Sequence, residues 1–164
     1  MSVRQRVAAS VLAASVAGLA FITGWEKREL RAYPDPALGW AVPTICDGHT
    51  GPDVRRGQVA TNAMCDAWLS KDAQKSVAAV VRCTGNQKLY RHELDALVSF
   101  IHNVGPTAFC SSTMAGLIRA GDYAAVGPQF DRWVYAGGKR LKGLANRRAA
   151  ERNLWERGDY GPVR

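Results

Sequence analysis

The apolar and polar positions divide the chain into three parts. Residues 7–25 carry no charged side chain and follow directly after Arg4 and Arg6. Between residues 27 and 60, glycine, proline and aspartate interrupt short apolar runs, a pattern typical of short strands and turns. From Thr61 onward the apolar positions recur at helical spacing. The pattern therefore predicts an α+β fold, with a small antiparallel β lobe, a larger and mostly helical lobe, and a cleft between them.

Five helices are expected in the larger lobe. The first follows Thr61, a suitable N-cap, and the second ends at Gly105, which precedes a proline. The third spans residues 113–120, the fourth runs from Asp122 toward Trp133, and the last covers residues 143–155. The apolar positions expected on the inner faces of the first two helices are Met64, Trp68, Val77, Val80 and Val81, then Leu94, Leu97, Val98 and Ile101.

The charge-free N-terminal segment has the length of a membrane span. As a single helix, residues 7–25 extend about 28 Å, close to the thickness of a bilayer's hydrocarbon core. Arginines before the segment and none within it predict that the chain after it is exported. Alanine, serine and glycine dominate the segment, which indicates a weak, reversible anchor. A signal peptide cleaved after Ala20 and a permanent anchor are the alternatives.

The length of the chain indicates a single domain, and its net charge indicates an anionic partner. The 164 residues fit one domain, and 22 lysines and arginines against 14 acidic residues give a net charge of +8. A positive field favours polyanions such as nucleic acid, anionic lipid or the acidic polymers of a bacterial wall. The basic residues are interleaved with acids along the chain, so no nucleic-acid-binding arm or helix stands out.

Four cysteines, Cys46, Cys65, Cys83 and Cys110, are typical of an exported protein with two disulfides. Four cysteines allow three pairings. A zinc site built from Cys46, His49 and Cys65 is the alternative, but no second compact pair of ligands completes it. No metal or other cofactor is expected.

Acidic residues gather after the apolar segment. Cleavage of a glycosidic bond needs one carboxylic acid that protonates the leaving oxygen and a second carboxylate, about 6.5–9.5 Å away when water attacks directly. A glutamate that follows an apolar helix is shielded from water, and an aspartate in a turn is solvated, so the two suit these different roles. The candidates are Glu26, Glu29, Asp35, Asp47 and Asp53.

Three stretches together resemble the phage-type lysozymes, glycoside hydrolase family 24. The first is WEKRELRAYPD with PTICDGHTG, the second is ALVSFIHNVGPTAFCSSTM, and the third is RWVYAGGKRLKGLANRRAAERNLW. They follow the family's order over residues 26–155. The resemblance implies a lysozyme-like fold and the catalytic set Glu26, Asp35 and Thr44. The step from Asp35 to Thr44 is about three residues longer than usual, and Asp47 stands where an aromatic residue is commoner, so Asp47 is the reserve for the second carboxylate.

The resemblance also implies roles and a substrate. Glu26 would protonate the glycosidic oxygen, and Asp35, helped by Thr44, would activate water. The substrate would be peptidoglycan, cut between N-acetylmuramic acid and N-acetylglucosamine by a monomeric enzyme. Asn103 would line the sugar cleft or form a turn. Beside the resemblance, Cys46–Cys65 and Cys83–Cys110 become the preferred disulfides, and Arg147 and Arg148 would attract the anionic wall or serve the structure.

The position of Glu26 just after the apolar segment resembles signal-arrest-release endolysins. Residues 1–25 would hold the chain inactive at the host inner membrane, facing the periplasm, and then become the first helix of the catalytic domain, residues 26–164, upon release to the periplasm. Three other functions remain open on the residues alone: a lytic transglycosylase, a zinc amidase and a non-enzymatic protein that disrupts membranes.

Overall fold

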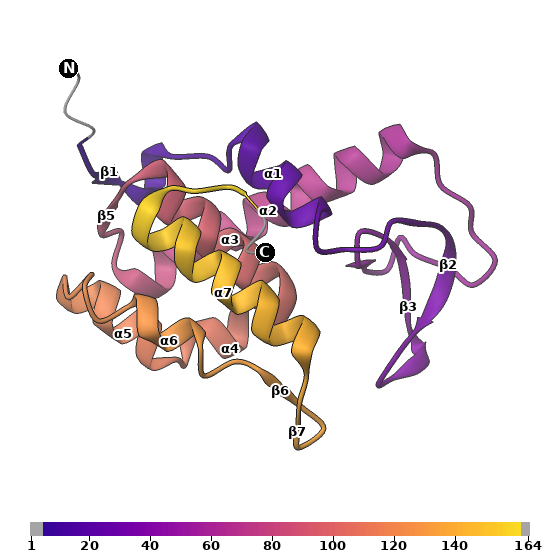
Figure 1. Ribbon diagram of the computed structural model, residues 1–164. Helices are drawn as coiled ribbons and strands as arrows, with labels where there is room; N and C mark the ends of the chain where they lie inside the picture. Colours follow the sequence, from indigo (N-terminus) through magenta and orange to yellow (C-terminus); the bar gives the residue numbers. More distant parts are fainter. Residues whose placement is uncertain (1–4, 162–164) are drawn as a thin grey trace.

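The computed structural model describes residues 5–161, so Arg4 lies outside the described residues. The chain folds into two lobes, as the pattern of the sequence predicts. In Figure 1 a β hairpin stands apart from the helices, and α1 (Val16–Thr23) and α2 (Asn62–Thr84) connect it to them. The α+β architecture is therefore confirmed.

The small lobe is a three-stranded antiparallel sheet. Its strands are β2 (Glu29–Asp35), β3 (Gly39–Cys46) and β4 (His49–Thr50), in that order across the sheet. Thr44 of the central strand lies opposite Tyr33 on one side and Thr50 on the other. A small core lies beneath the sheet and comprises Ala32, Ile45, Cys46, Val54, Ala60 and Cys65.

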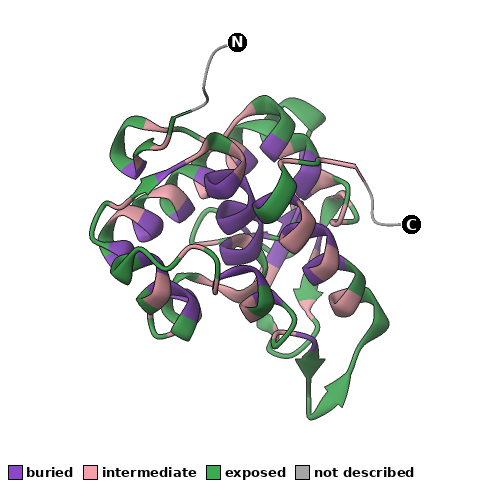
Figure 2. Cartoon of the chain, turned by 60° about the vertical axis from the view of Figure 1, so that its left-hand side comes forward, coloured by how far each residue is buried: buried purple, intermediate pink, exposed green. Residues whose placement is uncertain are grey.

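The large lobe is built around α3 (Arg91–Val104), in which all nine residues 93–101 are buried. Helices α1, α2, α4 (Pro106–Cys110) and α7 (Lys142–Arg157) pack against it. Figure 2 shows the buried positions gathered on these central helices. The remaining elements are α5 (Thr113–Ala120), α6 (Gly127–Phe130), the short strand β5 (Lys88–Leu89), and the hairpin of β6 (Tyr135–Ala136) and β7 (Lys139–Arg140).

Local signals place most helix ends correctly. Thr61 caps α2 by accepting a hydrogen bond from the Met64 backbone nitrogen at 3.2 Å, and α3 ends before Gly105, which has a φ of +87°. The predicted bounds of α5 are those observed. Two expectations are wrong. Met64 is exposed rather than inward-facing, and residues 122–126 are not helical, because Pro128 cannot sit inside a helix and instead lies in the first turn of α6.

The N-terminal segment is not one helix in this structure, which corrects the sequence-based expectation. It forms β1 (Val7–Ala8), a 3₁₀ turn η1 (Ala9–Val11) and α1. β1 pairs with β5, and Ser15 caps α1 by accepting a hydrogen bond from Gly18 at 2.9 Å. Breaking the segment allows Ala9, Phe21 and Ile22 to be buried in the main core, whereas a straight helix would hold one face in water. Within residues 5–161, no helix has the length and apolar character needed to cross a bilayer.

Both preferred disulfides are present. Cys46–Cys65 joins the end of β3 to the first turn of α2, with Cα atoms 5.3 Å apart. Cys83–Cys110 joins the end of α2 to α4, with Cα atoms 5.2 Å apart. The pairing that the resemblance implies is thus confirmed. Since Cys46 and Cys65 are bonded to each other, the alternative zinc site lacks its thiolate ligands.

Two helical glycines give a matched test of the packing of α1. A Cβ at Gly18 would lie 2.5 Å from the Asp95 carboxyl carbon, whereas a Cβ at Gly116 in α5 has no neighbour within 4 Å. Asp95 is 1% exposed and held by hydrogen bonds, so it cannot easily move aside.

We expect Gly18→Ala to lower the free energy of unfolding by about 1–3 kcal/mol through overpacking. We expect Gly116→Ala to raise it by about 0.5–1 kcal/mol through helix propensity. Urea denaturation followed by circular dichroism measures both. Equal effects of the two substitutions would contradict the packing of α1 on α3 described here.

Candidate active site

Glu26 is positioned by the end of α1. Ile22 is fully buried, and its carbonyl accepts hydrogen bonds from the backbone nitrogens of Trp25 at 2.9 Å and Glu26 at 3.3 Å. The burial of Ile22 thus determines where the chain leaves the helical lobe. The Glu26 side chain is 23% exposed and lines an open groove of about 560 Å³. The groove is also lined by Lys27, Glu29, Arg31, Ala32 and Tyr33.

Arg147 of α7 holds Glu26 from the helical lobe. Its Nη1 atom lies 2.5 Å from Glu26 Oε1, and its Nε atom lies 3.1 Å from Glu151 Oε1. Its Nη2 atom donates to the Ser99 carbonyl of α3 at 3.2 Å. Arg147 is 4% exposed, so this guanidinium is a buried, structural group rather than a surface cation that attracts the wall. Its positive charge is shared between two carboxylates.

Arg148 and Glu151 extend this buried cluster. Burial lowers the pKa of Arg148 to about 10, although the charge of Glu151 acts in the opposite direction. Burial likewise raises the pKa of Glu151, against the charges of Arg148 and Arg147. Arg148 Nε lies 2.9 Å from Glu151 Oε2 in an ion pair whose alignment is not that of a hydrogen bond, and its guanidinium stacks 4.9 Å from the Phe100 ring. Arg148 is therefore also structural.

Asn103 lies near the end of α3 and is exposed. Its Oδ1 atom accepts a hydrogen bond from Arg148 Nη2 at 2.8 Å. The side chain is therefore oriented by the buried cluster of α7. The alternative expectation, that Asn103 serves to form the turn, is wrong, because the residue is helical and the turn is made by Gly105.

Asp35 and Thr44 lie on the hairpin beyond the groove and are not among its lining residues. Asp35 Oδ1 accepts hydrogen bonds from the backbone nitrogens of Ala37 and Leu38, both at 2.8 Å, so the carboxylate orders the tip of the longer loop. Thr44 is 5% exposed, and its hydroxyl donates to the Val42 carbonyl at 3.3 Å.

Tyr33 connects the three expected catalytic positions. It lines the groove with Glu26, lies opposite Thr44 in the sheet, and precedes Asp35 by two residues on the same strand. Its pKa is raised by burial and then by the negative charges of Glu26, Glu29 and Asp35. The sequence-based interpretation missed this residue. Its place two positions before Asp35, in a strand of period two, was the available signal.

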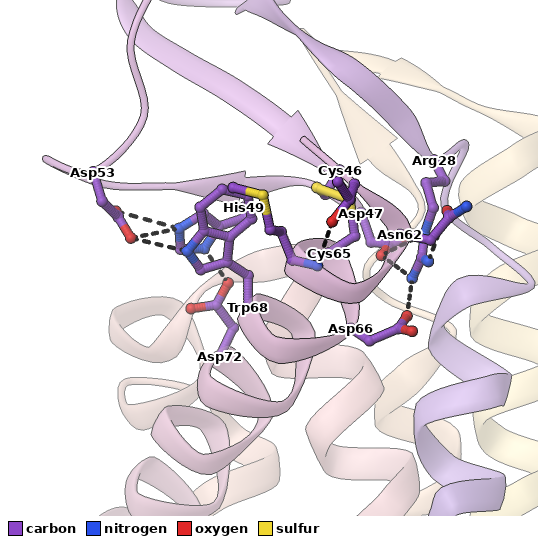
Figure 3. The surroundings of a disulfide bond; sticks show 12 residues. Arg28, Cys46, Asp47, His49, Asp53, Asn62, Cys65, Asp66, Trp68 and Asp72 are labelled. Carbon is purple, nitrogen blue, oxygen red and sulfur yellow. Dashed lines mark hydrogen bonds and ion pairs between the residues drawn. A yellow bond between two sulfur atoms is a disulfide. The ribbon is translucent and has the colours of Figure 1, made fainter. Parts of the chain in front are cut away.

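The other candidate carboxylates each have a partner. Glu29, which also lines the groove, forms an exposed pair with Lys27 at 2.6 Å. Asp47 is buried, and Arg28 holds both of its oxygens, with Nη2 2.7 Å from Oδ2 (Figure 3). Asp53 accepts a hydrogen bond from Trp68 Nε1 at 3.0 Å.

His49 belongs to the structure of the small lobe. Its Nδ1 atom lies 2.6 Å from Asp72 Oδ2, and its ring stacks on Trp68 at 4.9 Å between centroids (Figure 3). Burial acts to raise the pKa of Asp53, but hydrogen bonds from its own backbone and from His49 outweigh it, so that pKa lies below the ordinary value.

Comparison with known proteins finds relatives over most of the chain. The Phage lysozyme family matches residues 23–151. The SAR-endolysin of Escherichia phage Mu is 42% identical over 114 residues, which make up 70% of this chain and 66% of that protein. The SAR-endolysin of Enterobacteria phage PA-2 is 36% identical over an alignment of 163 positions, which covers 94% of this chain and 96% of that protein. Among solved structures, the endolysin from Escherichia coli O157:H7 phage FAHEc1 superposes with a TM-score of 0.77 at 32% identity, covering 92% of this chain and 98% of that one.

Two glutamates of α7 test the buried cluster. Each forms an ion pair with an arginine four residues earlier in the helix. The Glu151 side chain is 0% exposed, whereas the Glu156 side chain is 37% exposed. We expect Glu151→Ala to lower the free energy of unfolding by about 3–5 kcal/mol, because it leaves Arg147 and Arg148 buried without their shared partner.

We expect Glu156→Ala to change the free energy of unfolding by less than about 1 kcal/mol, because its pair with Arg152 is solvated. Urea denaturation of the two variants under the same conditions gives the comparison. A Glu151→Ala protein as stable as Glu156→Ala would show that the cluster does not hold α7 on α3.

Proposed function

The chain belongs to the phage lysozyme family, and from this premise we propose that it is a muramidase that lyses a bacterial host by degrading peptidoglycan. The bond cut is the β-1,4 linkage between N-acetylmuramic acid and N-acetylglucosamine. The observation that carries this proposal is the carboxyl group of Glu26, which lines an open groove along the linker and β2 and is oriented by a buried arginine. The enzyme acts as a monomer and needs no cofactor.

Glu26 is the general acid in this mechanism. Because Oε1 already accepts a hydrogen bond from Arg147, the proton to be donated belongs on Oε2. Arg147 also serves Glu151, so its charge does not act on Glu26 alone. Proton transfer to the glycosidic oxygen then breaks the bond to the leaving sugar, while positive charge develops on the sugar that water attacks.

Asp35 activates the attacking water, and Thr44 helps to position it. Asp35 Oδ1 is committed to two backbone N–H groups, while Oδ2 accepts no hydrogen bond from the described part of the chain. That second oxygen is the one available to take a proton from water. Asn103 contacts the sugar through its amide nitrogen, since Arg148 occupies its oxygen.

The reducing ends released from purified peptidoglycan test these roles. We expect Glu26→Gln and Asp35→Asn each to lower the initial rate by about 100- to 10,000-fold, because each removes a proton-transfer group. Both substitutions preserve the side-chain shape, and circular dichroism checks that the fold is retained.

The same assay separates the alternatives. A lytic transglycosylase would tolerate Asp35→Asn, and its products would end in anhydro sugars rather than reducing ends. An amidase would be inhibited by chelators and release no reducing ends. A membrane-disrupting protein would lyse cells with Glu26→Gln in place, and that result would overturn the proposal.

We further propose that residues 1–25 hold the enzyme at the inner membrane before release to the periplasm, and that residues 26–164 form the catalytic domain. Several relatives, among them those of phages Mu and PA-2, carry the name SAR-endolysin, and the charge-free stretch of residues 7–25 supports the same arrangement here. In the folded structure this stretch packs on α3 and leads directly into Glu26.

The docked segment is held by two buried carboxylates at the start of α3. Arg6 pairs with Glu93 at 2.5 Å, and its guanidinium lies 4.5 Å from the Tyr90 ring and 4.0 Å from the Tyr123 ring. Glu93 is 2% exposed, so Arg6 neutralises a charge that the folded body has already removed from water.

Asp95 is the second of these carboxylates. It accepts hydrogen bonds from the Ser15 backbone nitrogen at 2.9 Å, from the Ser15 hydroxyl at 2.5 Å and from the Tyr160 hydroxyl at 2.7 Å. While residues 7–25 lie in a bilayer, both carboxylates lack these partners from the segment, and Glu26 is held away from the groove. Docking of the segment satisfies the carboxylates and completes the active site together.

Leucine substitutions on the exposed side of the segment test the membrane-held state. Ala13, Ala17 and Ala20 are exposed in the docked structure, so replacing them with leucine strengthens membrane insertion without disturbing the contacts to Asp95. We expect the triple variant to stay in the membrane fraction and to delay host lysis. Membrane fractionation and lysis timing measure this, with a triple serine variant as the control.

The purified triple leucine variant, extracted and refolded, should retain the wild-type rate on peptidoglycan. If cells that express the triple leucine variant lyse on the wild-type schedule, residues 7–25 do not control release. An N-terminus beginning near Phe21 in the periplasmic form, found by mass spectrometry, would instead support cleavage of a signal peptide.

A further inference from the structure

The turn between β3 and β4 is anchored on two sides of the helical lobe. Cys46, which precedes the turn, is bonded to Cys65 of α2. His102 of α3 lies with Nε2 2.8 Å from the Asp47 carbonyl oxygen, to which it donates. Neither contact involves the Asp47 side chain, and Figure 3 shows the disulfide. The Asp47 carboxylate is therefore a fixed point between the lobes.

Arg28 is the group that this carboxylate holds. Its Nε atom lies 3.1 Å from each Asp47 oxygen, and its Nη2 atom lies 2.7 Å from Oδ2. Nη2 also lies 2.8 Å from Asp66 Oδ1. The two acidic partners differ in environment, because the Asp47 side chain is 3% exposed and the Asp66 side chain is 68% exposed. The pair with Asp47 is thus the one that water screens least.

Arg28 stands two residues after Glu26, in the linker that joins α1 to β2. The backbone nitrogen of Glu26 bonds to Ile22 at the start of this linker, and Arg28 bonds to Asp47 near its end. Residues 24–28 of this linker belong to no helix or strand. The linker's course past the groove is therefore set by these two attachments, by the pairing of Glu29 with Cys46 in the sheet, and by the side-chain contact of Glu26 to Arg147.

We propose that Arg28 and Asp47 are positioning residues for Glu26, and that their pair sets the depth at which the acid stands in the groove. The inference rests on the proposed acid role of Glu26. The carboxylate of Asp47 binds the guanidinium of Arg28 through both of its oxygens. Asp47 is accordingly an anchor and not the second carboxylate of the reaction, since both of its oxygens are occupied.

Loss of the pair has a defined kinetic signature. A misplaced acid slows proton transfer but leaves the sugar-binding surface unchanged, so kcat falls while KM stays nearly constant. We expect Asp47→Asn and Arg28→Gln each to lower kcat about 10- to 100-fold, with KM changed less than about twofold. Because the two residues act as a unit, the double variant should be no slower than the slower single variant.

The experiment measures kcat and KM on soluble peptidoglycan fragments for the full-length released protein and these three variants. Asp66→Asn is the matched control, since it removes the exposed partner of the same guanidinium and should leave kcat within about twofold of wild type. Urea denaturation reports stability in parallel. A kcat loss in Asp66→Asn equal to that of Asp47→Asn would overturn the proposal, as would additive losses in the double variant.

Two further results separate the alternatives. If Asp47 were the water-activating base, Asp47→Asn would lose activity as severely as a substitution of a catalytic group, while Arg28→Gln would remain mild. If Asp47→Asn does not fold, Arg28→Lys takes its place, because lysine keeps the charge but not the two-oxygen contact. An intermediate loss of kcat in Arg28→Lys supports the proposal, and an unchanged kcat contradicts it.

Failure of this inference is distinguishable from failure of the proposed function. If Glu26→Gln is inactive and Asp47→Asn has the wild-type kcat, only the positioning role is wrong. If Glu26→Gln is fully active, the acid role itself is wrong, whatever the other variants show.

Discussion

The guanidinium of Arg147 is the contact on which the site depends. It is buried between two carboxylates, Glu26 of the groove and Glu151 of its own helix, and it also bonds to the α3 backbone. A buried charge is stable only when its partners are in place, so α7, α3 and the end of α1 must assemble together. The sequence context of Arg147, among several basic residues, is that of a surface cation. In the structure, Arg147 instead links the buried core to the Glu26 side chain.

The position of Glu26 is fixed by contacts to both lobes. Arg147 reaches it from the helical lobe, and Arg28 attaches the following linker to the turn of the sheet lobe. The disulfide Cys46–Cys65 and the bond from His102 hold that turn to the helices. In the proposed mechanism, this arrangement lets an exposed groove keep its acid in one position, although the linker that carries the acid is irregular. In the proposed release from the membrane, the N-terminal segment determines when this arrangement forms, because α1 brings Ile22 and Glu26 into place.

Sequence patterns predicted those features that depend on neighbouring residues. Thr61 caps α2 and Gly105 ends α3, since capping and positive φ are properties of one or two positions. Met64 was expected inside because it lies at helical spacing, but the bond from Cys65 to the sheet rotates another face of α2 inward. The hairpin of β6 and β7 was missed, although Gly137 and Gly138, both with positive φ, are a hairpin signal.

The sequence by itself determined the α+β class, the family, the pairing of the cysteines through its resemblance, and Glu26 as the candidate acid. Only the tertiary structure decided that Asp47 is paired with Arg28, that Arg147 is buried, and that residues 7–25 fold as a strand, a turn and a short helix. The physical reason is the distance along the sequence between the residues that interact. Caps, turns and motifs depend on residues a few positions apart. Arg147, in contrast, lies 121 residues after Glu26, and Arg28 in its linker meets Asp47 in a turn 19 residues later. In the apolar segment, Ser15 is a local signal for the start of α1, whereas the pairing of β1 with β5 and the burial of Ala9 and Ile22 depend on distant partners.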